Sequence, residues 1–478
     1  MDTNSKWEKL LNQGRRKYDS RGDGHRENDT IPTRTEIERD YDRILFSTPV
    51  RRLGDKTQVF PLDNNDSVRN RLTHSHEVSN LARSIGVALV HKYSIAKDVP
   101  DACRNIPALL AAIGLVHDLG NPPFGHQGEA AIRSWFTDNR EKLTKDQSNN
   151  EVIRKELYED FLNFEGNAQG FRLVTRLQLL NDNFGLDLTY ATLSAMMKYP
   201  IPVSKIDKKK GVSHKKFGYF FSEEKIAQQV FQKTGLLEGK RHPLAYLMEA
   251  CDDIAYAVLD IEDAVKKGLA SFSDLIAYLD HHANGDLLIN ELIKESEEKH
   301  QEYRTAELSP DELNDVSMQR FRVFAIGKMV QAVTLTFTDN LDTYISGTAN
   351  QPILKSSEAE KLRQLLGDFS KIHAFQHRSV LEIELRGHNT IRSLMDCFWE
   401  AIRETDPDHP TKILSAPPFP RYVYTRISEN YRRVYTDPAL EIKQLPLRYR
   451  QLMLLTDMIS GMTDSYAMSL LEEFNSFR

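Results

Sequence analysis

An apolar run that ends in a histidine and an aspartate is the feature that most constrains how this chain folds. Residues 109–116 are almost all apolar, and His117 and Asp118 follow them directly. Such a run predicts a buried helix, which Gly120 and the prolines after it bring to an end. A histidine and a carboxylate buried without partners are costly, and a divalent cation would satisfy both. The sequence therefore predicts a metal site at the inner end of a buried helix.

Further candidate ligands and acid–base groups lie on either side of this pair. His126 and Glu129 follow in a turn rich in glycine and proline. Upstream, His74 stands at the start of a helix with a regular apolar stripe. His76 is two residues further on and points to another side of that helix. A His-Asp dipeptide alone fits a hydrogen-bonded histidine near a helix end, but the combination favours a metal-dependent active site.

Composition fits an intracellular protein. The 478 residues suffice for about two or three domains. Charged residues make up 28% and the net charge is −6, so the overall balance predicts neither a nucleic-acid nor an anionic membrane surface. The three cysteines are scattered, which argues against a disulfide framework and fits a reducing compartment. The first thirty residues are polar, and no run approaches the length of a membrane span, so we expect a cytoplasmic protein.

Helical periodicity recurs along the chain, whereas alternating runs rich in valine, isoleucine and threonine are rare, which predicts an all-α protein. Residues 1–30 are polar and predict a flexible N-terminal arm. The most regular helix is predicted over residues 244–265. Asp252, Tyr256 and Asp260 are spaced four residues apart on it and share one face, which is either solvated or part of a ligand site.

Three segments are rich in basic side chains. Residues 50–61 contain Gln58 after two arginines and a lysine, and form either a solvated loop or a contact to an anionic ligand. Residues 205–216 are rich in lysine and predict a surface loop that has the charge to contact phosphates. Residues 421–450 are rich in arginine and tyrosine, which suits contacts to anions or to a protein partner.

The order His74, His117-Asp118, Asp252 resembles the pattern of the HD-domain metal-dependent phosphohydrolases, an all-α superfamily. Longer motifs narrow the resemblance to the deoxyguanosine triphosphate triphosphohydrolase (dGTPase) family. In family order, these motifs are Arg71–Ser75, His117–Glu129, Phe164–Gln169, Lys198–Pro200, Asp252–Tyr256 and Gly461–Asp464. They cover the chain from about residue 34 to its end, and the second motif is highly specific.

The resemblance implies an HD-type helical core with additional N- and C-terminal helices. The catalytic core would span residues 31–270, and residues 271–478 would complete the site and form the oligomer interface. The implied ligands for Mg²⁺ or Mn²⁺ are His74, His117, Asp118 and Asp252. The implied catalytic pair is His126 and Glu129. The implied substrate contacts are Arg71, Lys198 and Tyr199 on the phosphates, and Tyr256, Asp260 and Gln58 on the sugar.

The activity implied by the resemblance is hydrolysis of a dNTP, preferably dGTP, to a 2′-deoxynucleoside and inorganic triphosphate. The chemistry of the site agrees, since a triphosphate carries about four negative charges and needs a cation with arginine and lysine donors. The family also implies a homo-oligomer, commonly a hexamer, with single-stranded DNA as an effector in some members.

Two alternatives remain. One is another HD phosphohydrolase, such as a nucleotidase or a phosphodiesterase, which would release different products. The other is a catalytically idle HD protein that binds nucleic acid. The presence of both His126 and Glu129 beside a complete set of ligands argues against the idle protein.

Overall fold

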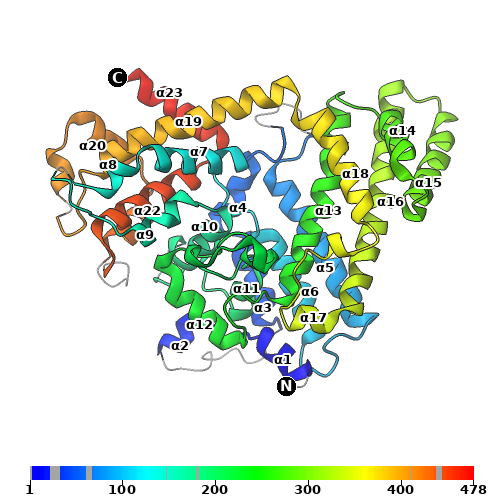
Figure 1. Cartoon of the computed structure of the whole chain (residues 1–478), viewed down its shortest axis with the longest axis horizontal. Helices are drawn as coiled ribbons and strands as arrows, with labels where there is room; N and C mark the ends of the chain where they lie inside the picture. Colours follow the sequence, from blue (N-terminus) through cyan, green and yellow to red (C-terminus); the bar gives the residue numbers. More distant parts are fainter. Residues whose placement is uncertain are drawn as a thin grey trace.

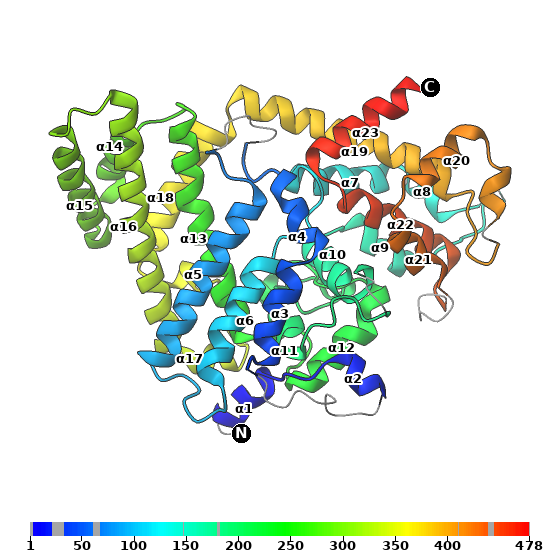
Figure 2. The ribbon, with the colours of Figure 1, turned by 180° about the vertical axis from the view of Figure 1, so that it is seen from behind.

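The computed structural model describes residues 3–21, 33–60, 67–146, 148–178, 182–409, 411–437 and 444–477. Within these ranges the chain forms α-helices joined by short 3-10 and π turns, and its β features are three isolated bridges. The predicted all-α class is confirmed (Figures 1 and 2). In the described part of the chain, no helix has the length and apolar character to cross a bilayer.

The centre of the molecule is a group of helices around α5, α6 and α13, which pack on one another. The helices of this group are α3 (Glu36–Leu45), α5 (Arg71–His91), α6 (Ala102–Val116), α11 (Tyr190–Ala195), α12 (Glu224–Thr234) and α13 (Pro243–Lys266). The apolar run predicted to be buried lies in α6, and its residues 109–116 are all buried. Asn70 caps α5 by accepting a hydrogen bond from the Thr73 N–H.

Helices α5 and α6 approach each other closely because Gly114 carries no side chain. A Cβ atom at Gly114 would lie 2.7 Å from the Cα of Ser79. The Ser79 hydroxyl donates a hydrogen bond to the carbonyl of Ala111 (2.8 Å), which holds the two helices at this spacing. The contact brings His74, near the start of α5, to His117, just beyond the end of α6.

On one side of the centre, α13 packs against α16 and α18, and α14 and α15 pack outside them, at the right in Figure 1. These helices are α14 (Phe272–Ala283), α15 (Leu287–Arg304), α16 (Pro310–Asp339), α17 (Leu341–Ile345) and α18 (Glu360–Ser370). A π-turn, η8 (Lys371–Phe375), follows α18 and leads into α19 (Arg378–Ile402).

On the other side, α19 runs along the top of the molecule in Figure 1 and packs on α7, α20, α22 and α23. The helices here are α7 (Gly125–Asp138), α8 (Arg140–Thr144), α9 (Lys155–Leu162), α10 (Gly166–Arg172), α20 (Pro418–Thr425), α21 (Glu429–Thr436), α22 (Leu447–Ser460) and α23 (Asp464–Ser476). Helix α19 contacts the ring of Phe124, and a Cβ at Gly387 would lie 2.5 Å from its Cγ. The absence of a side chain at Gly387 therefore allows α19 to lie against the start of α7.

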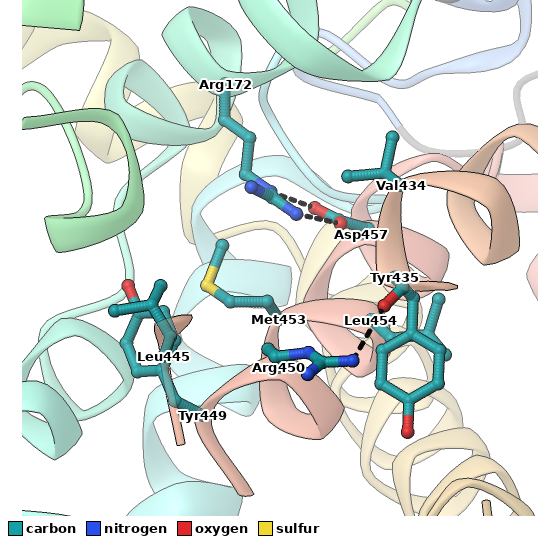
Figure 3. A pocket seen from close by; sticks show the side chains of 9 residues that line it. All are labelled: Arg172, Val434, Tyr435, Leu445, Tyr449, Arg450, Met453, Leu454 and Asp457. Carbon is teal, nitrogen blue, oxygen red and sulfur yellow. Dashed lines mark hydrogen bonds and ion pairs between the residues drawn. The ribbon is translucent and has the colours of Figure 1, made fainter. Parts of the chain in front are cut away.

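A buried ion pair joins the C-terminal helices to the predicted core. Arg172, at the end of α10, donates to both carboxylate oxygens of Asp457 in α22 (2.8 and 2.7 Å), and also to Glu223 (2.8 Å). Figure 3 shows Arg172 and Asp457 beside a cavity of about 10 Å³, which is room for roughly one water molecule. Removing one partner of such a pair would leave a buried charge without compensation.

The described part of the predicted N-terminal arm is ordered and packed, which corrects that expectation for residues 3–21. It forms α1 (Thr3–Leu10) and α2 (Arg16–Arg21), and a third short helix, α4 (Thr48–Arg52), follows α3. Trp7 is fully buried, and Arg15 pairs with the buried carboxylate of Asp40 (2.8 Å). The local sequence is polar, but a single tryptophan and a buried arginine anchor it to the core. Residues 22–30 of the predicted arm lie outside the described residues.

Because α19 packs closely on Phe124, we expect a single added methyl group at Gly387 to destabilise the fold. Gly387→Ala should lower the thermal unfolding midpoint, because overpacking costs about 1–3 kcal/mol. Gly327→Ala in α16 is the matched control, since its Cβ would meet nothing within 4 Å. Loss of that helical glycine should stabilise the fold by about 0.5–1 kcal/mol. Scanning calorimetry of both variants checks this, and an equal rise in the two midpoints would contradict it.

Candidate active site

A cleft of about 610 Å³ opens where α5, α7, α10 and α13 meet the start of α19. This volume lies in the range of sites that bind small molecules. Ten of the twelve predicted site residues line the cleft: Gln58, Arg71, His117, Asp118, His126, Glu129, Lys198, Tyr199, Asp252 and Tyr256. The other two, His74 and Asp260, are buried and do not line it.

The floor of the cleft holds a group of potential metal ligands from three helical segments. His74, His117 and Asp252 each offer one ligand atom, and these atoms lie within 4.8 Å of one another. The Nε2 atoms of His74 and His117 lie 3.2 Å and 3.5 Å from Asp252 Oδ1. Two imidazoles and a carboxylate suit Mn²⁺ and related divalent cations. The structure therefore brings together three of the four predicted ligands.

The state of His117 fits a cation at this position. Its Nδ1–H donates to the carbonyl of Gly114 (2.7 Å), which turns Nε2 toward Asp252. Nε2 is buried and has no hydrogen-bond partner among the described residues. Burial opposes protonation, but Asp118 and Asp252 outweigh it and raise the pKa of His117 to about 9. The carboxylates thus favour a positive charge here, which a metal ion would also supply.

Asp118, the fourth predicted ligand, stands at the edge of this group. Its Oδ1 lies 3.5 Å from His117 Nε2 and accepts a hydrogen bond from the Asn121 amide (2.6 Å). Its Oδ2 pairs with the guanidinium of Arg71. Burial opposes the charge on Asp118, but Arg71 and His117 outweigh it and lower its pKa to about 2. Asp118 is therefore an anion that can face both a cation and the guanidinium of Arg71.

His126 and Glu129 lie together in the first turn of α7, and not in a turn between helices as the glycines and prolines around them predict. The His126 side chain is 84% exposed and lines the cleft, and its Nδ1 lies 3.6 Å from Glu129 Oε2. Glu129 is buried, and its Oε1 accepts a hydrogen bond from the Gly166 N–H (2.8 Å). Burial opposes ionisation of Glu129, but His126 lowers its pKa. A fixed carboxylate thus orients an accessible imidazole.

Cationic side chains line the cleft around the ligand group. Lys198 lies 3.4 Å from Glu249 and 3.8 Å from Asp252, and these anions raise its pKa against the effect of burial. Tyr199 is buried beside it, with its ring beneath the Arg241 guanidinium (5.3 Å). The lysine-rich segment 205–216 is predicted to be a surface loop, and its last two residues, Lys215 and Lys216, line the cleft.

The predicted sugar-binding face of α13 is only partly exposed to the cleft. Tyr256 is 41% exposed and its ring lies 5.8 Å from that of Phe375. Gln58 lines the cleft, and its Oε1 has no hydrogen-bond partner among the described residues. Asp260 is buried, and one of its oxygens likewise has no partner in that part of the chain. The face is therefore not a solvated surface, but Asp260 lies beneath the cleft wall in this conformation.

Sequence reasoning missed the wall contributed by η8 and α19, which includes Phe375, Val380 and Glu384. Glu384 is half-buried, and burial raises its pKa. One signal was available in the sequence. Val380, Glu384 and Gly387 are spaced four and three residues apart, so the glutamate lies within the inward-facing stripe of a helix. A carboxylate in such a stripe indicates a polar site.

The helical fold and the His-Asp site define the class, and comparison with known proteins agrees. Residues 71–178 match the family model described as HD domain. A deoxyguanosinetriphosphate triphosphohydrolase-like protein of Listeria monocytogenes is 38% identical over 475 residues, which cover 98% of this chain and 99% of the relative. A deoxyguanosinetriphosphate triphosphohydrolase of Yersinia pestis is 31% identical, with 90% and 92% of the two chains covered.

The protein is thus an HD-domain protein. Because its relatives match over nearly the whole length of the chain, it belongs to the deoxyguanosinetriphosphate triphosphohydrolase family. The resemblance inferred from the motifs is confirmed, and with it the membership of an enzyme family.

The geometry separates the predicted metal ligands from the predicted acid–base pair, and substitutions should do the same. Asp252→Ala should abolish binding of Mn²⁺ and with it hydrolysis, because Asp252 contacts both histidines. His126→Ala should retain Mn²⁺ but lose hydrolytic rate by about a hundredfold or more. His76→Ala, on the exposed side of α5, is the control and should retain both. Metal content and rate measured on the same samples check this, and loss of Mn²⁺ from the His126 variant would make His126 a ligand.

Proposed function

We propose that the protein hydrolyses 2′-deoxynucleoside triphosphates, with dGTP preferred, to a 2′-deoxynucleoside and inorganic triphosphate. The observation that carries this proposal is the arrangement of the cleft, in which a group of metal ligands is surrounded by cations and faces an acid–base pair. The metal ligands would be His74, His117, Asp118 and Asp252. Bound there, Mg²⁺ or Mn²⁺ would neutralise phosphate charge and polarise a phosphoryl oxygen.

The cations would hold the triphosphate. Arg71, Lys198 and Lys216 all line the cleft, and two of them contact predicted ligands: Arg71 pairs with Asp118, and Lys198 lies 3.8 Å from Asp252. Each is held by a carboxylate: Arg71 by Asp118, Lys198 by Glu249 and Lys216 by Glu165 (2.7 Å). These pairs fix the positive groups in place before the substrate arrives, which reduces the reorganisation needed for binding. Tyr199 would add a hydroxyl donor.

The reaction breaks the bond between the α-phosphorus and O5′, so the departing O5′ must acquire a proton. We assign that proton transfer to His126, which is accessible in the cleft. Glu129 would keep the imidazole oriented, because it is itself fixed by the Gly166 N–H. A histidine is suited to this role because its ordinary pKa lies close to neutral pH. Water supplies the hydroxyl group that the triphosphate product gains.

The sugar would lie against Tyr256, with Gln58 and Asp260 as partners of the 3′-hydroxyl. A phenol ring packed on the sugar leaves a ribose 2′-hydroxyl without a hydrogen-bond partner, at a cost of about 1–3 kcal/mol. The orphaned oxygens of Gln58 and Asp260 are acceptors that a sugar hydroxyl would satisfy. Engagement of Asp260 requires a shift of the wall that now covers it.

The base would reach the wall built by Val59, Phe375 and Val380, where Glu384 is the available carboxylate. Guanine presents two adjacent donors, N1–H and the 2-amino group, and a carboxylate accepts two hydrogen bonds side by side. Adenine offers no such pair of donors. Glu384 is already held by the Gln127 amide (3.4 Å), so its position is partly fixed.

We further propose that the C-terminal region, residues 271–478, completes the site and carries the oligomer interface. Glu384 and Phe375 support the first part. For the second, a surface groove is lined by Arg421, Arg432, Arg433 and the rings of Tyr422 and Tyr424. Cations and stacking rings suit either a subunit contact or single-stranded DNA. Light scattering and assays with added oligonucleotide distinguish these roles. Residues 438–443 of this segment lie outside the described residues.

The products decide between this function and another HD phosphohydrolase. With Mn²⁺ or Mg²⁺, dGTP should yield deoxyguanosine and triphosphate in equal amounts, resolved by ion-exchange chromatography. GTP should react at least about tenfold more slowly because of its 2′-hydroxyl. Release of orthophosphate or a nucleoside monophosphate would contradict the proposal, and equal rates for GTP and dGTP would contradict the role of Tyr256.

Base preference should depend on Glu384. Glu384→Gln should lower kcat/KM for dGTP by about tenfold or more, since one acceptor becomes a donor that faces the guanine amide. The rate with dATP should change less, so the dGTP to dATP ratio should fall. Glu382→Gln, on the exposed side of the same helix, is the matched control. An unchanged ratio would remove Glu384 from base recognition.

A further inference from the structure

Asp464, the first residue of α23, is far in sequence from Thr57 and Phe124, which line the cleft, but its carboxylate accepts hydrogen bonds from both. Its side chain is 1% exposed. Oδ1 accepts a hydrogen bond from the Phe124 N–H (3.0 Å), and Oδ2 accepts one from the Thr57 N–H (2.9 Å). The Thr57 hydroxyl also donates to Oδ2. One buried carboxylate thus satisfies three donors from two segments.

Both segments carry residues of the cleft. Thr57 directly precedes Gln58, and Phe124 is the residue from which α7 starts, two positions before His126. Phe124 has a φ of 59°, in the left-handed region that a phenylalanine rarely adopts. Such a conformation persists only where surrounding contacts hold it. Its backbone is held by Asp464 and its ring by α19 at Gly387.

The turn before α23 reinforces this connection. Lys56 donates to the carbonyl of Ser460 (2.9 Å) and to that of Asn121 (2.5 Å), so it links the turn to the loop after Asp118. Arg52 donates to the carbonyl of Gly461 (2.9 Å). Together these bonds tie the segment from 52 to 57, the loop from 121 to 124 and the C-terminal turn into one unit.

We propose that Asp464 is a positioning residue, which holds the Phe124 and Thr57 backbones so that His126 and Gln58 face the substrate. The inference rests on the proposed function for its substrate, but Asp464 itself has no role in that function. A carboxylate is required because it only accepts hydrogen bonds, and all three groups directed at it are donors. A displacement of about 1 Å at a reacting group costs on the order of a hundredfold in rate.

Asp464→Asn tests the proposal, because it keeps the size of the side chain and replaces one acceptor by a donor. We expect kcat to fall by about tenfold or more. Mn²⁺ binding should be unchanged, since His74 and Asp252 contact neither Asp464 nor its partners. Ser465→Ala is the matched control. It removes a hydrogen bond to Asp55 (2.8 Å) at the next position and should leave kcat as it is.

A double-mutant cycle separates positioning from general destabilisation. If Asp464 acts through His126, Asp464→Asn should change the residual rate of the His126→Ala protein by less than about threefold. A full multiplicative loss in that background would overturn the proposal. The cycle uses ratios of rates with whichever phosphate ester the unmodified protein cleaves, so a different substrate would overturn the proposed function and leave this test intact.

Two further measurements cover an inactive or unstable variant. A crystal structure of Asp464→Asn should show His126 displaced from Glu129, and an unchanged imidazole position would overturn the proposal.

Should Asp464→Asn fail to fold, Thr57→Val removes the hydroxyl bond alone and leaves Phe124 held. That variant should raise KM by about threefold to tenfold through Gln58 without lowering kcat. A fall in kcat with unchanged KM would count against the assigned geometry.

Discussion

The close packing of α5 on α6, with α13 across them, is the constraint on which the site depends. Gly114 lets the helices approach until His74 and His117 both reach the Asp252 carboxylate on α13. Two imidazoles and a carboxylate, buried or partly buried at this spacing, are stable only when their lone pairs and charges are satisfied. The apolar core around them provides rigidity, and the polar group at its inner end provides the chemistry.

Charge in the cleft is paired before any ligand binds. Asp118 holds Arg71, Glu165 holds Lys216, and Lys198 lies between Glu249 and Asp252. A divalent cation would bind the carboxylates of these pairs, and a polyphosphate would bind the arginine and the lysines. Positive and negative groups therefore remain buried at low cost in either state.

The described part of the C-terminal third contributes to the cleft, although none of the predicted metal ligands lies in it. Helix α19 contributes Glu384 to the cleft and packs on Phe124, while α22 is joined to α10 through Arg172 and Asp457. The start of α23 holds the backbone before His126. These contacts are packing, hydrogen bonds and ion pairs between segments far apart in the sequence, so the positions of His126 and Glu129 depend on elements at the opposite end of the chain.

The sequence by itself determined the helical class and the buried run that ends in His117-Asp118, because both rest on local periodicity. The specific motifs also identified the family. Only the tertiary structure decided which distant segments meet. It placed Glu384 in the cleft, buried Asp260, and anchored the polar N-terminal residues through Trp7. Those outcomes depend on which helix faces are covered by others, and local sequence does not encode that.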